Sequence, residues 1–312
     1  MYSNIPRSEE YRQRLLEYIR QEYGIRAAAL APAKRGYYGE TWRLDAANGG
    51  YFLKLVYPAA HQVVYERSFP VIQHLCDHGI DFISRIVKTK DGSLSTRFDG
   101  AMLGVFDWID GENIETDVTK IPEYQMLARV YAVPCCGVPI VREDFSVTSA
   151  EKFFERWNAL DNTQIGSLLE NRRGKLEHRA KRLKYFAGLC QGDTAKFFIT
   201  HGDAGGNLMV NGDRYFIVDW DNPVLAPPER DAWVMCSRDW ARGAFSNALR
   251  QNGIRHTLRS ERLAYYCYHF FFFFYLAAYL DGFTETDTVR EIEEYIDGWI
   301  ADSIQYADAD AI

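Results

Sequence analysis

Several patterns that would place a protein in a common class are absent from this sequence of 312 residues. Its six cysteines have a spacing that indicates neither a disulfide framework nor a zinc ribbon, and they fit reduced thiols of a cytoplasmic protein. The first residues include no apolar stretch of the kind that forms a signal peptide, so we do not expect export. Neither a Walker sequence nor a Gly-x-Ser-x-Gly motif occurs, which argues against P-loop and α/β-hydrolase enzymes.

A surplus of positive charge is also missing. The formal net charge is −7, so we do not expect a nucleic-acid partner. The charge is uneven along the chain, because residues 1–106 carry a net +3 and the remainder carries a net −10. An acidic second part would suit a cationic small molecule, although surface solubility is the more common reason for such acidity.

One long uncharged stretch is present, but its composition does not favour a membrane span. It covers residues 264–280, includes five consecutive phenylalanines, and is bracketed by Arg262 and Asp281. Crossing the hydrocarbon core takes about 20 apolar residues, whereas this stretch has 17 residues and is rich in tyrosine. We therefore predict a buried helix and no membrane partner.

The first third of the sequence predicts a small antiparallel sheet with two helices. The first helix is expected over residues 8–23, with Ser8 at its start and Gly24 at its end. Asn48-Gly49 between two apolar segments is a strong hairpin signal. The expected strands are 41–44, 51–56, 83–87, 94–98 and 101–106, and the second helix is expected at 61–78 despite Pro70.

Long helical periodicity replaces the strand pattern after residue 111. The helices are expected at 121–133, 150–160, 165–190, 259–280 and 286–304. Residues 1–107 would therefore form a smaller N-terminal lobe, and residues 108–312 a larger C-terminal lobe. The predicted fold class is α+β, with a small antiparallel-sheet N-lobe and a large helical C-lobe.

The run of residues 201–221 carries the clearest chemical signal. Asp203 and Asn207 lie four residues apart on a Gly-rich loop, and Asp219 follows the apolar strand 215–218. A loop that positions a hydroxyl group, followed by an Asp that holds a metal ion, is the arrangement that kinases use for phosphoryl transfer. We therefore predict Asp203 as the catalytic residue that positions the acceptor hydroxyl, and Asn207 and Asp219 as magnesium ligands.

A purely structural explanation exists for these polar residues. An Asp in a loop commonly forms a turn or caps a helix, and Asp221 could equally help to hold the metal ion or cap the turn before Pro223. Against this explanation, His201 precedes Asp203 and can brace its loop, while Asn207 offers a neutral oxygen to magnesium.

Lys54 and Glu66 lie upstream of this run, in the order that a kinase needs. Lys54 is in the apolar strand 52–56, where a lone Lys often faces solvent. Glu66 lies on the next helix, from which a carboxylate can pair with the Lys and direct it at the α- and β-phosphates of a nucleotide. Charges on a solvated surface would give the same pattern, but the downstream motif favours the functional interpretation.

Gly36 and Gly39 lie in the first turn of the predicted sheet. A missing Cβ lets backbone N–H groups approach a phosphate, so these residues are candidates for binding the nucleotide. Their spacing is not Gly-x-Gly-x-x-Gly, and a plain turn fits at least as well.

Together these residues resemble the aminoglycoside phosphotransferases, relatives of choline kinase with a protein-kinase-like fold. Residues 217–231 read Ile-Val-Asp-Trp-Asp-Asn-Pro-Val-Leu-Ala-Pro-Pro-Glu-Arg-Asp. This block is particularly similar to the spectinomycin phosphotransferase branch, where a Trp-Asp-x-Pro-x-Leu-Ala-Pro-x-Glu-Arg-Asp run follows the metal Asp. The resemblance covers the whole chain in the order of its parts.

The resemblance implies a kinase that binds ATP or GTP, with Mg²⁺, between two lobes. The base would be hydrogen-bonded to the backbone near Phe106 to Trp108, and the acceptor would lie against the helical lobe. The resemblance also implies a cytoplasmic antibiotic-resistance enzyme. Such an enzyme phosphorylates a hydroxyl group of an aminoglycoside- or spectinomycin-like compound. Glu229, Arg230 and Asp231 would form a structural ion-pair set. The sequence fits a monomer and a homodimer equally.

One feature departs from the family. Relatives usually have five residue steps from the catalytic Asp to the Asn, whereas Asp203 to Asn207 is four. Gly205 and Gly206 can adopt positive φ and tighten the path, so we expect Asn207 to remain a ligand.

Two other functions stay open at this point. A metabolic kinase of an amino alcohol or a sugar would use the same fold. The shortened loop also suits a catalytically weak nucleotide-binding module.

Overall fold

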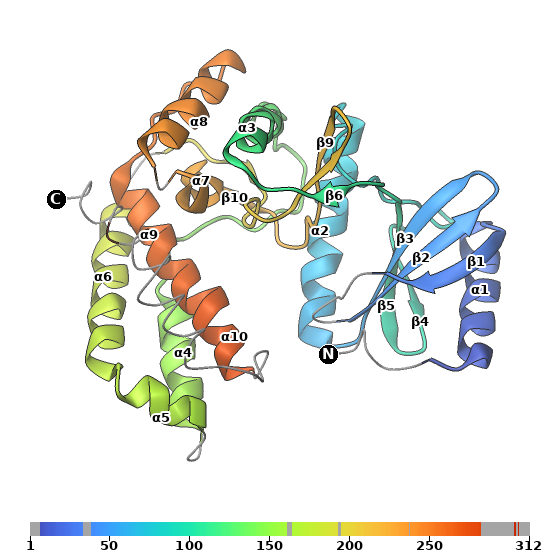
Figure 1. The fold of residues 1–312 in the computed structure, drawn as a ribbon, viewed down its shortest axis with the longest axis horizontal. Helices are drawn as coiled ribbons and strands as arrows, with labels where there is room; N and C mark the ends of the chain where they lie inside the picture. Colours follow the sequence, from blue (N-terminus) through green and yellow to red (C-terminus); the bar gives the residue numbers. More distant parts are fainter. Residues whose placement is uncertain are drawn as a thin grey trace. The chain divides into compact units, whose positions relative to one another are not determined.

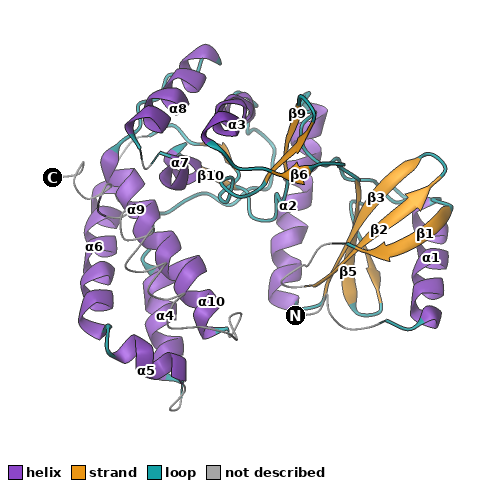
Figure 2. Ribbon diagram, in the orientation of Figure 1, coloured by secondary structure: helices purple, strands orange, loops and turns teal. Residues whose placement is uncertain are grey.

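A computed structural model of the chain describes residues 7–33, 39–160, 164–192, 195–236 and 238–281, together with residues 303 and 305. The chain divides into two compact units: unit 1 is Met1–Val141 with His201–Val224, and unit 2 is Arg142–Thr200 with Leu225–Ile312. Figures 1 and 2 show the elements of both. This division differs from the predicted lobes 1–107 and 108–312, and that lobe boundary stays a prediction.

Unit 1 is built on a five-stranded sheet with the order β1-β2-β3-β5-β4 (Figure 1). Its strands are β1 (Ala27–Pro32), β2 (Gly39–Ala46), β3 (Gly49–Val56), β4 (Thr96–Phe98) and β5 (Ala101–Asp107). The predicted hairpin is confirmed, since β2 and β3 are antiparallel from Gly39↔Val56 to Ala46↔Gly49. The turn consists of Ala47 and Asn48.

The predicted set of five strands was wrong in one member. β1 was missed because it is rich in alanine, which has a low strand propensity. The expected strand 83–87 is instead an isolated bridge between Ile86 and Phe106. β3 occupies one edge of β5 and β4 occupies the start of the other edge, so only the end of β5 is left for Ile86.

The two faces of this sheet carry different helices. Side chains alternate along β3, so Tyr51, Leu53 and Leu55 are buried in one core with α1 (Glu9–Tyr23). Lys54 points to the opposite face, which α2 (Ala59–Asp77) covers. Figure 2 shows one helix on each side of the sheet.

The predicted ends of α1 are confirmed. The side chain of Ser8 accepts a hydrogen bond from the N–H of Tyr11, and Gly24 ends the helix with φ 74°. The predicted second helix is confirmed as α2, which continues through Pro70.

A second, three-stranded sheet in unit 1 has the order β6-β8-β9. Its strands are β6 (Glu112–Asn113), β8 (Leu208–Asn211) and β9 (Arg214–Ile217), and α3 (Asp117–Tyr131) follows β6. β8 and β9 form a hairpin around a two-residue turn, Gly212-Asp213.

Unit 2 is largely helical. Its helices are α4 (Thr148–Asn158), α5 (Gln164–Glu170), α6 (Arg173–Gln191), α7 (Glu229–Met235), α8 (Asp239–Gln251), α9 (Ser260–Phe270), η2 (Phe271–Leu276) and α10 (Ala277–Leu280), and β7 (Phe198–Thr200) and β10 (Val224–Ala226) form a two-stranded sheet. The helix expected at 165–190 is divided between α5 and α6, and α7 and α8 were not predicted. The expected helix 286–304 lies outside the described residues except for Ser303.

The uncharged stretch forms a buried helix, as predicted. Tyr265, Tyr266 and Phe270 in α9 are fully buried. Phe270 stacks on Trp233 of α7 with ring centroids 5.3 Å apart. By length and composition alone, the helical stretch Ser260–Leu280 could cross a membrane. However, 61% of its most apolar 18-residue segment is buried inside the protein.

Candidate functional site

His201 fixes the loop that carries Asp203. Its Nε2 lies 2.8 Å from the carbonyl oxygen of Val218. A carbonyl can only accept, so Nε2 carries the proton and Nδ1 is the acceptor for the backbone N–H of Asp203, at 3.2 Å. The buried imidazole also meets the ring of Trp220 edge-on, at 4.6 Å. The predicted brace is confirmed, and it joins the loop to the residue after β9.

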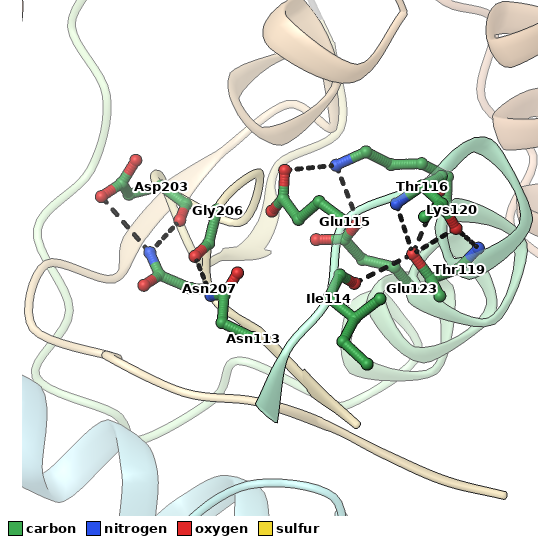
Figure 3. Close-up of polar contacts among 10 residues, drawn as sticks. All are labelled: Asn113, Ile114, Glu115, Thr116, Thr119, Lys120, Glu123, Asp203, Gly206 and Asn207. Carbon is green, nitrogen blue, oxygen red and sulfur yellow. Dashed lines mark hydrogen bonds and ion pairs between the residues drawn. The ribbon is translucent and has the colours of Figure 1, made fainter. Parts of the chain in front are cut away.

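The loop closes although it is one residue short. The N–H of Asn207 donates to the carbonyl of Ala204 at 3.1 Å, and its Nδ2 donates to the carbonyl of Asp203 at 2.6 Å (Figure 3). The positive φ that we expected occurs at Gly206, with φ 115°, but not at Gly205. Asn113 of β6 holds this turn from outside, since its Nδ2 donates to the carbonyl of Gly206 at 2.6 Å.

The β8–β9 hairpin brings Asn207 close to Asp219. Leu208 pairs with Ile217, and the N–H of Val218 donates to the carbonyl of Asn207 at 2.9 Å. Asn207 therefore lies opposite Val218, one residue before Asp219. Asp219 has φ 64°, a left-handed conformation that few residues other than glycine adopt and that is concentrated at functional sites.

Lys54 completes the group from the other sheet of unit 1. Its Nζ lies 3.2 Å from Oδ1 of Asp219 and 2.5 Å from Oδ2 of Asp221. The Lys54 side chain is only 14% exposed, whereas that of Asp219 is 50% exposed. The structure thus brings together Lys54 and Asp219, and Asp219 remains open to a ligand.

Each charge of this cluster changes the pKa of its neighbours. Burial alone would lower the pKa of Lys54, but Asp219 and Asp221 outweigh it and raise that pKa well above its ordinary value. The charge of Lys54 lowers the pKa of Asp219. Burial, together with the charge of Asp219, raises the pKa of Asp221. Asp219 is therefore the carboxylate that stays anionic, as a metal ligand must.

The expected pair between Lys54 and Glu66 is wrong, because Glu66 pairs with a different residue. Oε1 of Glu66 lies 3.4 Å from Nη2 of Arg97, and the Glu66 side chain is 52% exposed. Glu66 sits one residue beyond the face of α2 that packs on the sheet, so Lys54 meets its neighbour Tyr65 instead. The hydroxyl of Tyr65 donates to Oδ2 of Asp221.

Tyr65 was missed by sequence reasoning, although a signal for it exists. Gln62, Tyr65, Phe69 and Ile72 recur at helical spacing and are all buried. This stripe predicts that Tyr65, not Glu66, faces the sheet.

Gly36 lies outside the described residues, and Gly39 has a structural reason to be glycine. A Cβ on Gly39 would lie 1.8 Å from the carbonyl oxygen of Leu55 on β3. Only glycine lets β2 approach β3 so closely at this point. Its role in binding a phosphate stays a prediction.

Phe106 and Trp108 lie at the end of β5, where the nucleotide base was expected. The N–H of Trp108 donates to the carbonyl of Gly50 at 3.0 Å, and the N–H of Asp107 donates to the carbonyl of Arg85 at 2.9 Å. Both N–H groups already donate to carbonyls of the protein. A nucleotide base bound here would therefore form hydrogen bonds with other groups of the segment.

The side-chain oxygens of Asn207 and Asp219 are of the kind that binds magnesium together with a nucleotide. Among the described residues, no group of three or more His, Cys, Asp and Glu side chains is placed to hold a metal ion. Magnesium needs fewer protein ligands, because one or two carboxylates with substrate phosphates and water usually complete its shell. Nδ2 of Asn207 donates to the carbonyl of Asp203, so the group that Asn207 would offer a cation is its amide oxygen, and the group that Asp219 would offer is its carboxylate.

A polar cluster beside the loop was also not predicted. Nζ of Lys120 lies 3.3 Å from Oε2 of Glu115 and 3.3 Å from Oε2 of the fully buried Glu123 (Figure 3). Oε1 of Glu115 would be 3.9 Å from a Cβ on Gly206. About 90 residues separate these side chains from the loop in sequence, so no local spacing indicates them.

Of the predicted ion-pair set Glu229, Arg230 and Asp231, Glu229 forms ion pairs in unit 2, but with residues outside that set. The buried carboxylate of Glu229 accepts from Nη1 of Arg262 at 3.0 Å and from the N–H of Arg259 at 2.8 Å. Nε2 of His256 lies 2.9 Å from its other oxygen. Glu229 thus ties α7 to the segment that leads into α9.

Known proteins resemble this chain in sequence pattern and in fold. A model of the phosphotransferase enzyme family matches residues 29–266. No curated protein sequence matches the chain closely. The fold is similar to that of an AMP-bound spectinomycin phosphotransferase, with 19% identity, a TM-score of 0.75, and 95% of this chain and 98% of that chain covered.

Two further solved structures have different names but a similar fold. A microcompartment-associated aminopropanol kinase shares 14% identity, with a TM-score of 0.67 and coverage of 96% of this chain and 98% of that chain. A choline kinase from Streptococcus pneumoniae shares 12% identity, with a TM-score of 0.65 and coverage of 94% and 100%. The predicted α+β fold, with an antiparallel-sheet N-terminal region and a helical C-terminal region, is confirmed.

Proposed function

Because the chain belongs to the phosphotransferase enzyme family, we propose that it is a small-molecule kinase that transfers the γ-phosphoryl group of ATP or GTP to a hydroxyl group. One observation carries this proposal. The 3.2 Å ion pair between Lys54 and Asp219 joins the five-stranded sheet to the hairpin on which Asn207 contacts Asp203. These four side chains would thus supply the phosphate-binding, acceptor-orienting and metal-binding groups that phosphoryl transfer needs.

The nucleotide phosphates and the metal ion would be held by different residues. Lys54 would bind phosphate oxygens through its ammonium group, which the two neighbouring carboxylates keep charged against the effect of burial. Asn207 and Asp219 would hold Mg²⁺, which when bound supplies positive charge against the phosphate oxygens. Gly36, Gly39, Phe106 and Trp108 remain proposed contacts of the nucleotide.

Asp203 would act on the acceptor. Its carboxylate would orient the hydroxyl group and receive its proton as the acceptor oxygen bonds to the γ-phosphorus. The bond between that phosphorus and the β–γ bridging oxygen breaks, and the nucleoside diphosphate leaves. His201 and Asn207 hold the Asp203 backbone through hydrogen bonds, which keeps the carboxylate in one place.

The acceptor that we propose first is a hydroxylated cation of the aminoglycoside or spectinomycin type. A spectinomycin phosphotransferase solved with ADP and spectinomycin has a similar fold, and the block of residues 220–231 resembles that branch. The net charge of −10 over residues 107–312 and the carboxylate of Glu115 beside Gly206 also suit a cation. On this proposal the protein is an antibiotic-resistance enzyme of the cytoplasm, and it acts as a monomer or a homodimer.

A second candidate is a kinase of an amino alcohol. The similar folds of the aminopropanol kinase and the choline kinase favour it, and such acceptors also combine a hydroxyl group with a positive charge. A catalytically weak module is less well supported, because the short loop still holds Asn207 against Asp203.

A phosphorylation screen tests the proposal. The purified protein is incubated with Mg-ATP or Mg-GTP and separate sets of antibiotics, amino alcohols and sugars, and products are identified by mass spectrometry. We expect one set to gain a phosphoryl group. Asp203→Ala should lower turnover by about 10²–10⁴-fold while nucleotide binding survives. The proposal fails if no set is phosphorylated and calorimetry detects no nucleotide binding.

A further inference from the structure

Tyr65 and Glu66 are neighbours on α2, but only Tyr65 faces the sheet. Tyr65 is 3% exposed and belongs to the buried stripe of Gln62, Phe69 and Ile72. Successive residues of a helix are rotated by about 100°, so Glu66 points away from this stripe and reaches Arg97 instead. A Cβ on Gly104 would lie 2.7 Å from Cζ of Phe69, which shows how tightly this face of α2 packs on β5.

Tyr65 touches both partners of an ion pair. Its hydroxyl donates to Oδ2 of Asp221, the same oxygen that lies 2.5 Å from Nζ of Lys54. Nζ of Lys54 also lies 4.6 Å from the centroid of the Tyr65 ring, within the range of a cation–π contact. The phenol therefore fixes the position of Asp221 through its hydroxyl and that of Lys54 through its ring.

We propose that Tyr65 is the positioning residue that holds Lys54 and Asp221 for nucleotide binding, in the place where Glu66 was expected. The inference deepens the proposed function and rests on it, because it assumes that Lys54 binds phosphate. A phenol positions the lysine without adding a formal negative charge on α2. An ammonium group has three N–H donors, and a phosphate oxygen can take the one that does not point to Asp219 or Asp221.

The hydroxyl and the ring of Tyr65 make separate predictions. Tyr65→Phe keeps the ring above Lys54 but removes the donor to Asp221, so the dissociation constant of Mg-ADP should rise about tenfold, the size of a hydrogen bond to a charged group. Tyr65→Leu also removes the ring and should raise it further. Because the effect is on nucleotide binding, KM for the nucleotide should rise in both variants more than kcat falls.

Three comparisons complete the experiment. Tyr18→Phe is the matched control, because the hydroxyl of Tyr18 donates to the carbonyl of Arg97 at 2.7 Å on a different part of the same unit. It should leave the dissociation constant of Mg-ADP unchanged. Glu66→Gln tests the competing assignment and should change that constant less than Tyr65→Phe does. Lys54→Met reports whether the lysine binds the nucleotide at all.

Calorimetry with Mg-ADP separates the outcomes. The proposal is overturned if Tyr65→Phe binds like the wild type while Lys54→Met loses affinity, and also if Glu66→Gln shows the larger loss. A weaker binding of Tyr65→Leu alone, with Tyr65→Phe unaffected, would assign Tyr65 to packing and reject its hydroxyl. If the wild type binds no nucleotide, the proposed function fails and this inference fails with it.

Discussion

Lys54 and Asp219 are 165 residues apart in the sequence, and their side chains form an ion pair of 3.2 Å. Lys54 comes from the middle of β3, and Asp219 follows the last strand of the β8–β9 hairpin. The pair connects the residue proposed to bind phosphates with the residue proposed to hold magnesium.

Replacing His201 should damage the loop that carries Asp203. His201→Ala removes the donor to the carbonyl of Val218 and the acceptor for the N–H of Asp203. A buried polar group left without its partner costs about 1–3 kcal/mol, so the unfolding temperature should fall. A shift of about 1 Å at a catalytic group lowers turnover about 10²-fold. Steady-state kinetics and thermal unfolding measure the two effects. A variant with the wild-type kcat would show that turnover does not depend on the hydrogen bonds of His201.

Asn207 should control the need for magnesium. Asn207→Ala removes the amide oxygen proposed as a ligand and the donor to Asp203. The magnesium concentration that gives half-maximal nucleotide binding should rise by at least about tenfold. Asn211→Ala, at the exposed end of β8, the strand that follows Asn207, is the matched control and should match the wild type. An unchanged magnesium requirement in Asn207→Ala would remove Asn207 from the metal site.

Gly39 should be intolerant of a side chain for a reason unrelated to ligand binding. The Cβ of Gly39→Ala would meet the carbonyl oxygen of Leu55 at 1.8 Å, and a backbone atom cannot move aside easily. The variant should lose about 1–3 kcal/mol of its free energy of unfolding. Gly188→Ala is the contrasting change, because nothing lies within 4 Å of its Cβ on α6.

Gly188→Ala should instead gain about 0.5–1 kcal/mol, since alanine is a better helix former than glycine. Denaturant unfolding of both variants checks the pair. Equal stabilities of Gly39→Ala and the wild type would show that β2 can shift away from β3.

His269 should make unit 2 sensitive to acid. Burial, with the charge of Arg230, lowers the pKa of His269 to about 3. In the unfolded chain an imidazole has a pKa of about 6.5, so below that pH the unfolded state binds the extra proton. The stabilisation by the neutral imidazole is thus complete above about pH 6.5 and is lost as the pH falls towards 3.

The change can amount to at most about 1.4 kcal/mol per pH unit. His269→Gln removes the titrating group, so its stability should fall less steeply than that of the wild type between about pH 6.5 and 4.5. Denaturant unfolding at several pH values gives the two slopes. Parallel curves would contradict a neutral His269 in the folded protein.

Local signals in the sequence predicted much of the fold because they act over a few residues. Ser8 caps the start of α1 with its side chain, and Gly24 ends the helix in a left-handed conformation. The hairpin signal at Asn48-Gly49 was correct as well. The failures depend on pairing between distant segments. β1 pairs with the outer edge of β2, whereas β3 and β4 leave residues 83–87 only the end of β5.

The site shows the same division. Asp203, Asn207 and Asp219 lie on one loop and hairpin, so their proximity follows from local pairing. The choice between Tyr65 and Glu66 depends on how α2 is rotated against the sheet, which the packing of Phe69 against β5 decides. Counting charges alone favoured Glu66, whereas the buried stripe on α2 would have favoured Tyr65.

Calorimetric titration with ADP, with and without magnesium, tests the central claim most directly, because the claim is that Lys54, Asn207 and Asp219 form one magnesium–nucleotide site. We predict that the wild type binds Mg-ADP and that Lys54→Met and Asp219→Asn each bind it at least about tenfold more weakly, the size of a lost charged contact. Omitting magnesium should weaken the wild type but not weaken Asp219→Asn further. Equal affinities of the wild type and both variants, with and without magnesium, would contradict the site.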